Sequence, residues 1–146
     1  MRLTQFSDYS LRVLLYLAIH PERWVPLPEI SRAYGVSQNH LVKVAQTLQE
    51  RGYVESLRGR GGGLRLAKAA RSINVGAVVR ATEPHFDLVE CFNGENNTCP
   101  IDLACGFRSA LLAAQKAFLR ELNRFTLADF EPRAPALIKL WNRKLG

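Results

Sequence analysis

The three cysteines have the most distinctive chemistry in this chain of 146 residues. Cys91, Cys99 and Cys105 follow a C-x7-C-x5-C pattern, and the chain has no other cysteine. An odd number of cysteines does not suit a disulfide framework. Structural zinc usually uses a closer pair, separated by two to four residues. Wide spacing on a loop instead favours a larger cluster, and cysteine thiolates are the usual ligands of iron–sulfur clusters.

Other interpretations of the cysteines stay open from the residues alone. In the first interpretation the three cysteines are unrelated thiols. In the second they bind zinc together with His85. Three cysteines leave one ligand position of a cluster for another residue type or for a labile group. The surrounding acids favour a bound cation; they are Asp87, Glu90, Glu95 and Asp102.

Charge divides the chain into parts with different partners. The net charge is +7, made of +7 in residues 1–80, −5 in residues 81–106 and +5 in residues 107–146. A basic small protein favours a polyanionic partner, most commonly nucleic acid. The sequence therefore predicts a basic DNA-binding half, followed by an acidic segment that contains all the cysteines.

The first half has the pattern of a winged helix-turn-helix. A mostly buried helix is expected over residues 4–20, followed by a short helix over 28–34 that Gly35 ends. Ser37 is a suitable N-cap for a second helix over 38–51, and two short helices around a glycine turn are typical of a helix-turn-helix. Short strands at 53–57 and 64–66 enclose a glycine-rich, basic tip that predicts a wing. A further helix is expected over 74–82.

The candidate DNA contacts lie on the second of these short helices and on the wing. A recognition helix places its N-terminal residues at base edges, where amide side chains read adenine and lysine reads guanine or binds phosphate. Ser37 with the helix N-terminus suits a phosphate. A solvated polar first turn is the alternative, but the basic wing favours DNA. The predicted contacts are Ser37, Gln38, Asn39, His40, Lys43, Arg58, Arg60, Gly61 and Gly62.

The second half is expected to hold a loop, a long helix and a tail. The apolar residues Leu111, Phe118 and Phe125 are seven apart on a helix over 107–125, which predicts that a second subunit covers this face. The sequence thus predicts one mainly α domain that forms a homodimer. Its regions are 1–83 (helix-turn-helix about 28–51, wing about 53–67), the cysteine loop 84–105, a dimerisation helix 106–130 and a weakly structured tail 131–146.

Two classes of protein are disfavoured. The longest apolar run near the N-terminus, Val13–Ile19, is too short to span a membrane. Asp8 and Arg12 interrupt any signal-peptide pattern, so a cytoplasmic protein is expected. No Ser/His/Asp set, paired carboxylate site or CxxC motif indicates an enzyme.

Four stretches of the chain together resemble a known family. They are residues 3–12 (LTQFSDYSLR), residues 34–43 (YGVSQNHLVK), the wing 54–66 with its RGRGGG core, and the cysteine segment. The chain resembles the iron–sulfur winged-helix repressors that include NsrR, IscR and RirA, over residues 1 to about 130. The resemblance implies a [2Fe-2S] or [4Fe-4S] cluster on the three cysteines, with Asp8 from the partner subunit as fourth ligand. It also makes Arg12 a group that orients this carboxylate, whereas the residues alone favour an ordinary i,i+4 salt bridge.

Departures from the family pattern narrow the expected signal. IscR-like members carry histidine three residues after the third cysteine, where this chain has Arg108. The gap between the first two cysteines matches RirA-like iron regulators, but Asp8 favours the nitric-oxide-responsive branch. The prediction is therefore a repressor of a pseudo-palindromic operator that loses DNA affinity when nitric oxide damages its cluster. An iron-responsive regulator is the alternative, followed by a zinc-stabilised DNA-binding protein.

Overall fold

Helix α1 (Gln5–Ile19) is the centre of the computed structural model, which describes residues 1–146. The Thr4 hydroxyl caps it by accepting a hydrogen bond from the backbone amide of Ser7 at 3.2 Å. Seven of its residues are buried, and the helix contacts α3, α4, β2 and η4. The predicted central position of this helix is confirmed, whereas somewhat fewer than half of its residues are buried.

The helix-turn-helix consists of α2 (Leu27–Tyr34) and α3 (Gln38–Glu50). Gly35 ends α2 in the left-handed region, with φ of 66°, which glycine adopts without a steric penalty. Ser37 occupies the N-cap position of α3, but its side chain makes no capping hydrogen bond. The apolar face of α3 is buried against the core through Leu41, Val44, Ala45 and Leu48.

The wing is an antiparallel hairpin of β1 (Val54–Leu57) and β2 (Gly63–Leu66). Val25 adds a short bridge to it, because Val25 and Leu64 exchange two backbone hydrogen bonds of 2.8 Å. A Cβ atom on Gly63 would lie 2.3 Å from the carbonyl oxygen of Val25, and one on Gly62 would lie 2.1 Å from that of Leu57. Glycine at these positions therefore lets backbones approach closely.

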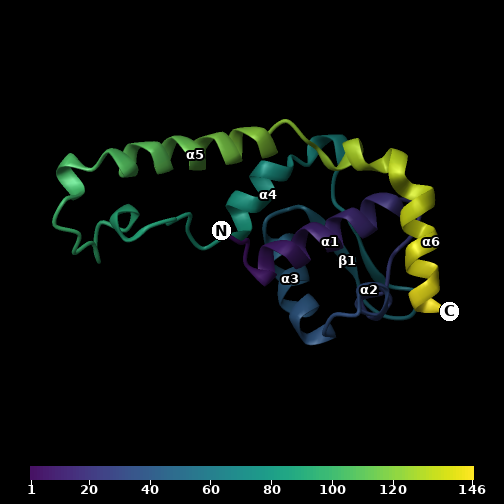
Figure 1. Cartoon of the computed structure of the whole chain (residues 1–146). Coiled ribbons are helices and arrows are strands. Elements are labelled where there is room, and N and C mark those ends of the chain that lie inside the picture. The colour runs from purple at the N-terminus through teal and green to yellow at the C-terminus, as the bar shows by residue number, and fades with distance from the viewer.

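The cysteine segment and a long helix project from the rest of the chain (Figure 1). After η1 (Ala70–Ser72), α4 (Val75–Thr82) leads into a loop with two single turns, η2 (Glu90–Phe92) and η3 (Asp102–Ala104). Helix α5 (Gly106–Leu122) follows and has no buried residue. We call residues 84–122 the cysteine lobe and the remainder the head. The helix predicted over 107–125 thus ends three residues earlier.

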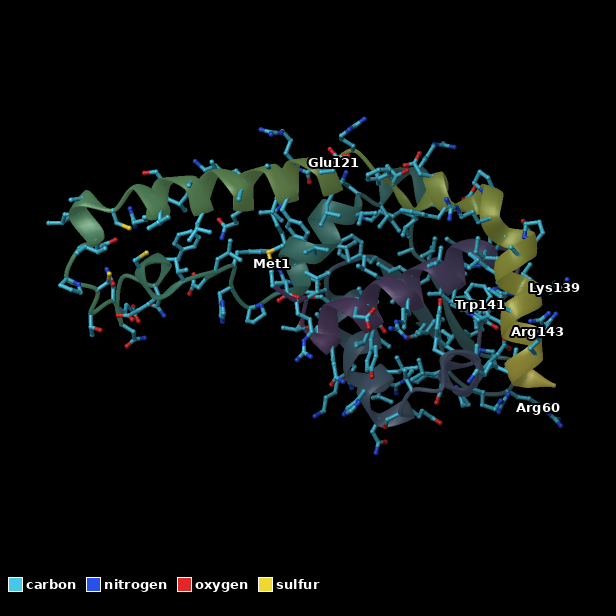
Figure 2. The ribbon with its side chains drawn as sticks, in the orientation of Figure 1. Met1, Arg60, Glu121, Lys139, Trp141 and Arg143 are labelled. Atoms are coloured by element: carbon cyan, nitrogen blue, oxygen red, sulfur yellow. The ribbon has the colours of Figure 1, made fainter.

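The prediction of a weakly structured tail from residue 131 is wrong. Residues Leu127–Arg133 form η4, and Ala134–Leu145 form helix α6. Trp141 is 6% exposed, and its ring centroid lies 4.6 Å from that of Tyr16 and 5.6 Å from that of Tyr34. Figure 2 shows Trp141 on the side of α6 that faces α1, whereas Lys139 points away. Leu137 and Ile138 of the same helix are partly buried against the core, so Trp141 is the most buried of several apolar side chains that hold α6 in place.

Burial raises the pKa of the tyrosine hydroxyls in this aromatic cluster. Desolvation, with a hydrogen bond to Glu29, raises the pKa of Tyr16 to about 12. The Tyr16 hydroxyl donates that hydrogen bond at 2.7 Å, which links α1 to α2. None of the helices is both long enough and apolar enough to span a membrane.

We expect Trp141→Ala to lower the free energy of unfolding by about 3–5 kcal/mol, because it removes a buried aromatic side chain and leaves a cavity. The control is Leu140→Ala, since Leu140 is 56% exposed on the same helix. Urea unfolding followed by circular dichroism measures both variants. Equal stability of the two variants would show that α6 does not contribute to the core.

Candidate DNA-binding surface and cysteine lobe

The first turn of α3 presents a polar face to solvent. The predicted contacts on this helix, from Ser37 to His40 together with Lys43, are all exposed. Lys43 has no acidic partner. Because the opposite face of α3 is buried in the core, this helix is rigidly placed for docking into a major groove.

The tip of the wing presents two unpaired guanidinium groups. Arg58 and Arg60 are exposed, and neither forms an ion pair. Gly59 and Gly61 have φ values of 92° and 75°, so the tip needs glycine there. Arg65 differs, because it pairs with Glu55 and stacks on Trp24 at 4.2 Å. The two tip arginines are therefore the free basic groups of the wing.

Sequence reasoning missed a contact between α1 and the recognition helix. The rings of Tyr9 and His40 lie with centroids 6.2 Å apart. A cleft of about 330 Å³ lies beside them, with Thr4, Phe6 and Lys43 also in its wall. No local pattern marks such a pair, because the two residues are far apart in the chain and both are polar aromatics on otherwise regular helices.

The cysteine lobe is held by polar contacts between its turns. Glu90 accepts hydrogen bonds from the Thr98 hydroxyl at 2.7 Å and from its backbone amide, and both lower the pKa of Glu90. Asp102 accepts a hydrogen bond from Asn97 at 2.8 Å and pairs with Arg108 at 3.0 Å. Its buried Oδ1 atom has no aligned hydrogen-bond donor, so the Arg108 contact is electrostatic.

The three cysteines are free thiols on different parts of this lobe. Cys91 lies in η2, Cys99 lies in the loop, and Cys105 is the N-cap residue of α5. Each is half-buried. Three free, partly accessible thiols in one segment are a suitable donor set for an iron–sulfur cluster.

The single chain does not bring a complete metal-binding set together. No three His, Cys, Asp or Glu side chains lie close enough to hold a metal ion. His85 instead lies next to Asp87, with 3.8 Å between its Nδ1 and the carboxylate. These side chains therefore do not form a site for a single ion, whereas an iron–sulfur cluster is larger and takes thiolates from more widely spaced positions.

Asp8 lies in the head and is engaged by Arg12. The guanidinium donates two hydrogen bonds to the carboxylate, at 2.9 and 2.7 Å, and these raise the pKa of Arg12. The same guanidinium lies 5.7 Å from the ring centroids of Tyr9 and Tyr34. The structure thus does not group Asp8 with the cysteines of its own chain.

Apolar side chains at the far end of the lobe lack cover. Leu103 is fully exposed, Phe107 is 79% exposed and Ile101 is 59% exposed. These residues flank Cys105 and the start of α5. Their exposure suits burial against another protein surface.

Known proteins are similar to this chain over nearly its full length. A family model described as an iron-dependent transcriptional regulator, Rrf2, matches residues 3–132. The HTH-type transcriptional regulator NsrR of Halalkalibacterium halodurans is 46% identical, with 96% of this chain and 99% of that protein covered. NsrR of Bacillus subtilis is 43% identical, with 99% of each covered.

A solved structure agrees with these relatives. The structure of T. potens IscR superposes with a TM-score of 0.73 at 27% identity, covering 92% of this chain and 88% of that chain. The predicted winged helix-turn-helix fold and the resemblance to this family are confirmed, as is the prediction of a regulator instead of an enzyme. The unpaired basic side chains on α3 and the wing and the three cysteines are consistent with these relatives. The chain belongs to the Rrf2 family of iron-dependent transcriptional regulators.

Proposed function

We propose that this regulator is a repressor that senses nitric oxide through an iron–sulfur cluster. The observation that carries the proposal is that a lobe with three free thiols is attached to a winged-helix head whose exposed basic side chains have no acidic partner. The relatives named NsrR, similar over nearly the full chain, support this type of signal. A DNA partner implies a cytoplasmic location.

Cys91, Cys99 and Cys105 are the proposed cluster ligands, with Asp8 of the partner subunit as the fourth. When bound, a cluster of this kind supplies iron that reacts with nitric oxide. Asp8 is suited to a replaceable role, because Arg12 already offers its carboxylate an alternative partner at 2.7 Å. Arg12 orients Asp8 in the assembled site and receives it when the carboxylate is released.

A homodimer is the proposed DNA-binding form. The exposed side chains of Leu103 and Phe107 and the unburied helix α5 leave a surface that a second copy can cover. A twofold dimer presents two recognition helices to two half-sites of a pseudo-palindromic operator. Each head then contributes Gln38, Asn39, His40 and Lys43 to base or phosphate contacts, and the wing adds Arg58 and Arg60, with Ser37, Gly61 and Gly62 near the backbone.

The response needs only a small change in the placement of the two heads. With Asp8 held by the partner's cluster, α1 of one subunit is fixed to the lobe of the other. Release of Asp8 to Arg12 removes this restraint. A bias of a few kcal/mol between two arrangements is enough to change operator affinity.

Iron status is the second candidate signal, favoured by the seven-residue gap between Cys91 and Cys99. Two measurements separate these signals, because an iron-responsive protein loses operator affinity on iron chelation and keeps it when nitric oxide is added at low concentration. A zinc site with His85 is disfavoured because no three potential ligands, His85 included, lie close enough together to hold an ion. Metal analysis with an anaerobic absorption spectrum separates zinc from an iron–sulfur cluster.

We expect Cys99→Ala to abolish visible cluster absorbance and to lower operator affinity to that of the apoprotein, while the thermal unfolding midpoint of the apoprotein stays unchanged. The reason is that Cys99 lies in the lobe, outside the buried core. Ser109→Ala, an exposed change on α5, is the control and keeps the absorbance. Retained absorbance in the Cys99 variant would refute its assignment as a ligand.

Arg60→Ala should weaken operator binding and reduce the slope of log affinity against log salt by about one phosphate contact. Titrations at several salt concentrations, followed by fluorescence anisotropy, measure the slope. Arg124→Ala is the control, because Arg124 is exposed at the end of α5 and already pairs with Glu121. A slope equal to that of the unmodified protein would remove Arg60 from the phosphate contacts.

A further inference from the structure

Two residues at the end of α4 hold the first turn of α1. The Glu83 carboxylate accepts hydrogen bonds from the Thr4 backbone amide at 2.8 Å and from the Thr4 hydroxyl at 3.0 Å. The hydroxyls of Thr82 and Ser7, both buried, lie 2.8 Å apart. The start of α1 is therefore attached to α4 by side chains as well as by apolar packing.

Glu83 is a strong partner for this helix end. A carboxylate at a helix N-terminus is stabilised by the helix dipole, and hydrogen bonds to an ionised group are stronger than neutral ones. Glu83 forms no ion pair, so its hydrogen bonds to Thr4 are the interactions that position its carboxylate.

The location of Glu83 gives this contact its significance. Pro84 follows at once, so Glu83 is the residue from which the cysteine loop begins. Three residues on, the carbonyl of Phe86 accepts a hydrogen bond from the Gln115 amide of α5. We call residues 83–86 the loop root. The loop root is thus hydrogen-bonded to α1 through Glu83 and to α5 through Phe86. A cavity of about 490 Å³ lies between these two contacts, which leaves space for the loop root to shift.

The other end of the connection is the recognition helix. Asp8 and Tyr9 follow Thr4 by little more than one turn of the same helix, and Tyr9 lies against His40 of α3. A helical turn is rigid, so a shift of Thr4 moves Tyr9 with it. A continuous series of contacts therefore connects the loop root, through α1, to the recognition helix within a single subunit.

We propose that Glu83 is a positioning residue that couples the arrangement of the cysteine loop to the placement of α1 and of the recognition helix in its own subunit. The inference rests on the proposed function, because it needs a cysteine loop that holds a cluster. It adds a second consequence: the α1 helix that offers Asp8 to the partner's cluster is itself positioned by its own loop.

The contact is tested first in the apoprotein, without any cluster. Hydrogen–deuterium exchange of the peptide that covers the first turn of α1 is compared among the unmodified protein, Glu83→Ala, Glu83→Gln and the control Glu22→Ala. Glu22 is an exposed acid without a hydrogen-bond partner. Faster exchange is expected for Glu83→Ala alone, since glutamine retains an acceptor oxygen. An unchanged exchange rate in Glu83→Ala would overturn the proposed positioning of α1 by Glu83.

The coupling is tested by the ratio of operator affinities with and without cluster. A merely structural residue changes both affinities together and leaves the ratio unchanged. We expect Glu83→Ala to reduce the ratio about fivefold, with cluster absorbance retained and the ratio restored in Glu83→Gln. An unchanged ratio in Glu83→Ala overturns this inference while the proposed function stands. A ratio of one in the unmodified protein overturns the proposed function and this inference with it.

Discussion

The rest of the structure depends on the burial of α1. Val13, Leu14 and Leu17 are at most 1% exposed, and around them pack the recognition helix, α4, the second wing strand and η4. The proposed DNA-binding surface and the start of the cysteine lobe are therefore attached to the same helix. A signal that moves this helix would therefore reach the recognition helix through direct packing contacts.

The division of charge follows the same arrangement. Lys43 of α3 and the tip arginines Arg58 and Arg60 are exposed and unpaired, so they remain available to phosphates. The acids of the cysteine lobe are partly neutralised within the lobe, as in the pair between Asp102 and Arg108. The net charge is thus +7 over residues 1–80 and −5 over residues 81–106, which favours DNA binding by the head.

Much of the fold and part of the site could be predicted from the sequence, because the signals are local. Gly35 and the apolar spacing from Leu41 to Leu48 define the helix-turn-helix, and glycines with tip arginines define the wing. Helix α6 was missed because its burial depends on Trp141 meeting Tyr16, a distant residue. The contacts of Glu83 with Thr4 and of Tyr9 with His40 were missed for the same reason. The ligand role of Asp8 remains a prediction, since in the single chain Arg12 holds its carboxylate.

The central claim is that the cysteine lobe controls the affinity of the head for DNA. The most direct measurement is an anaerobic titration of nitric oxide into cluster-loaded protein, with operator affinity and visible absorbance followed in the same samples. The account predicts that operator affinity falls in step with the loss of cluster absorbance. Operator affinity that stays unchanged after the absorbance is lost would contradict it.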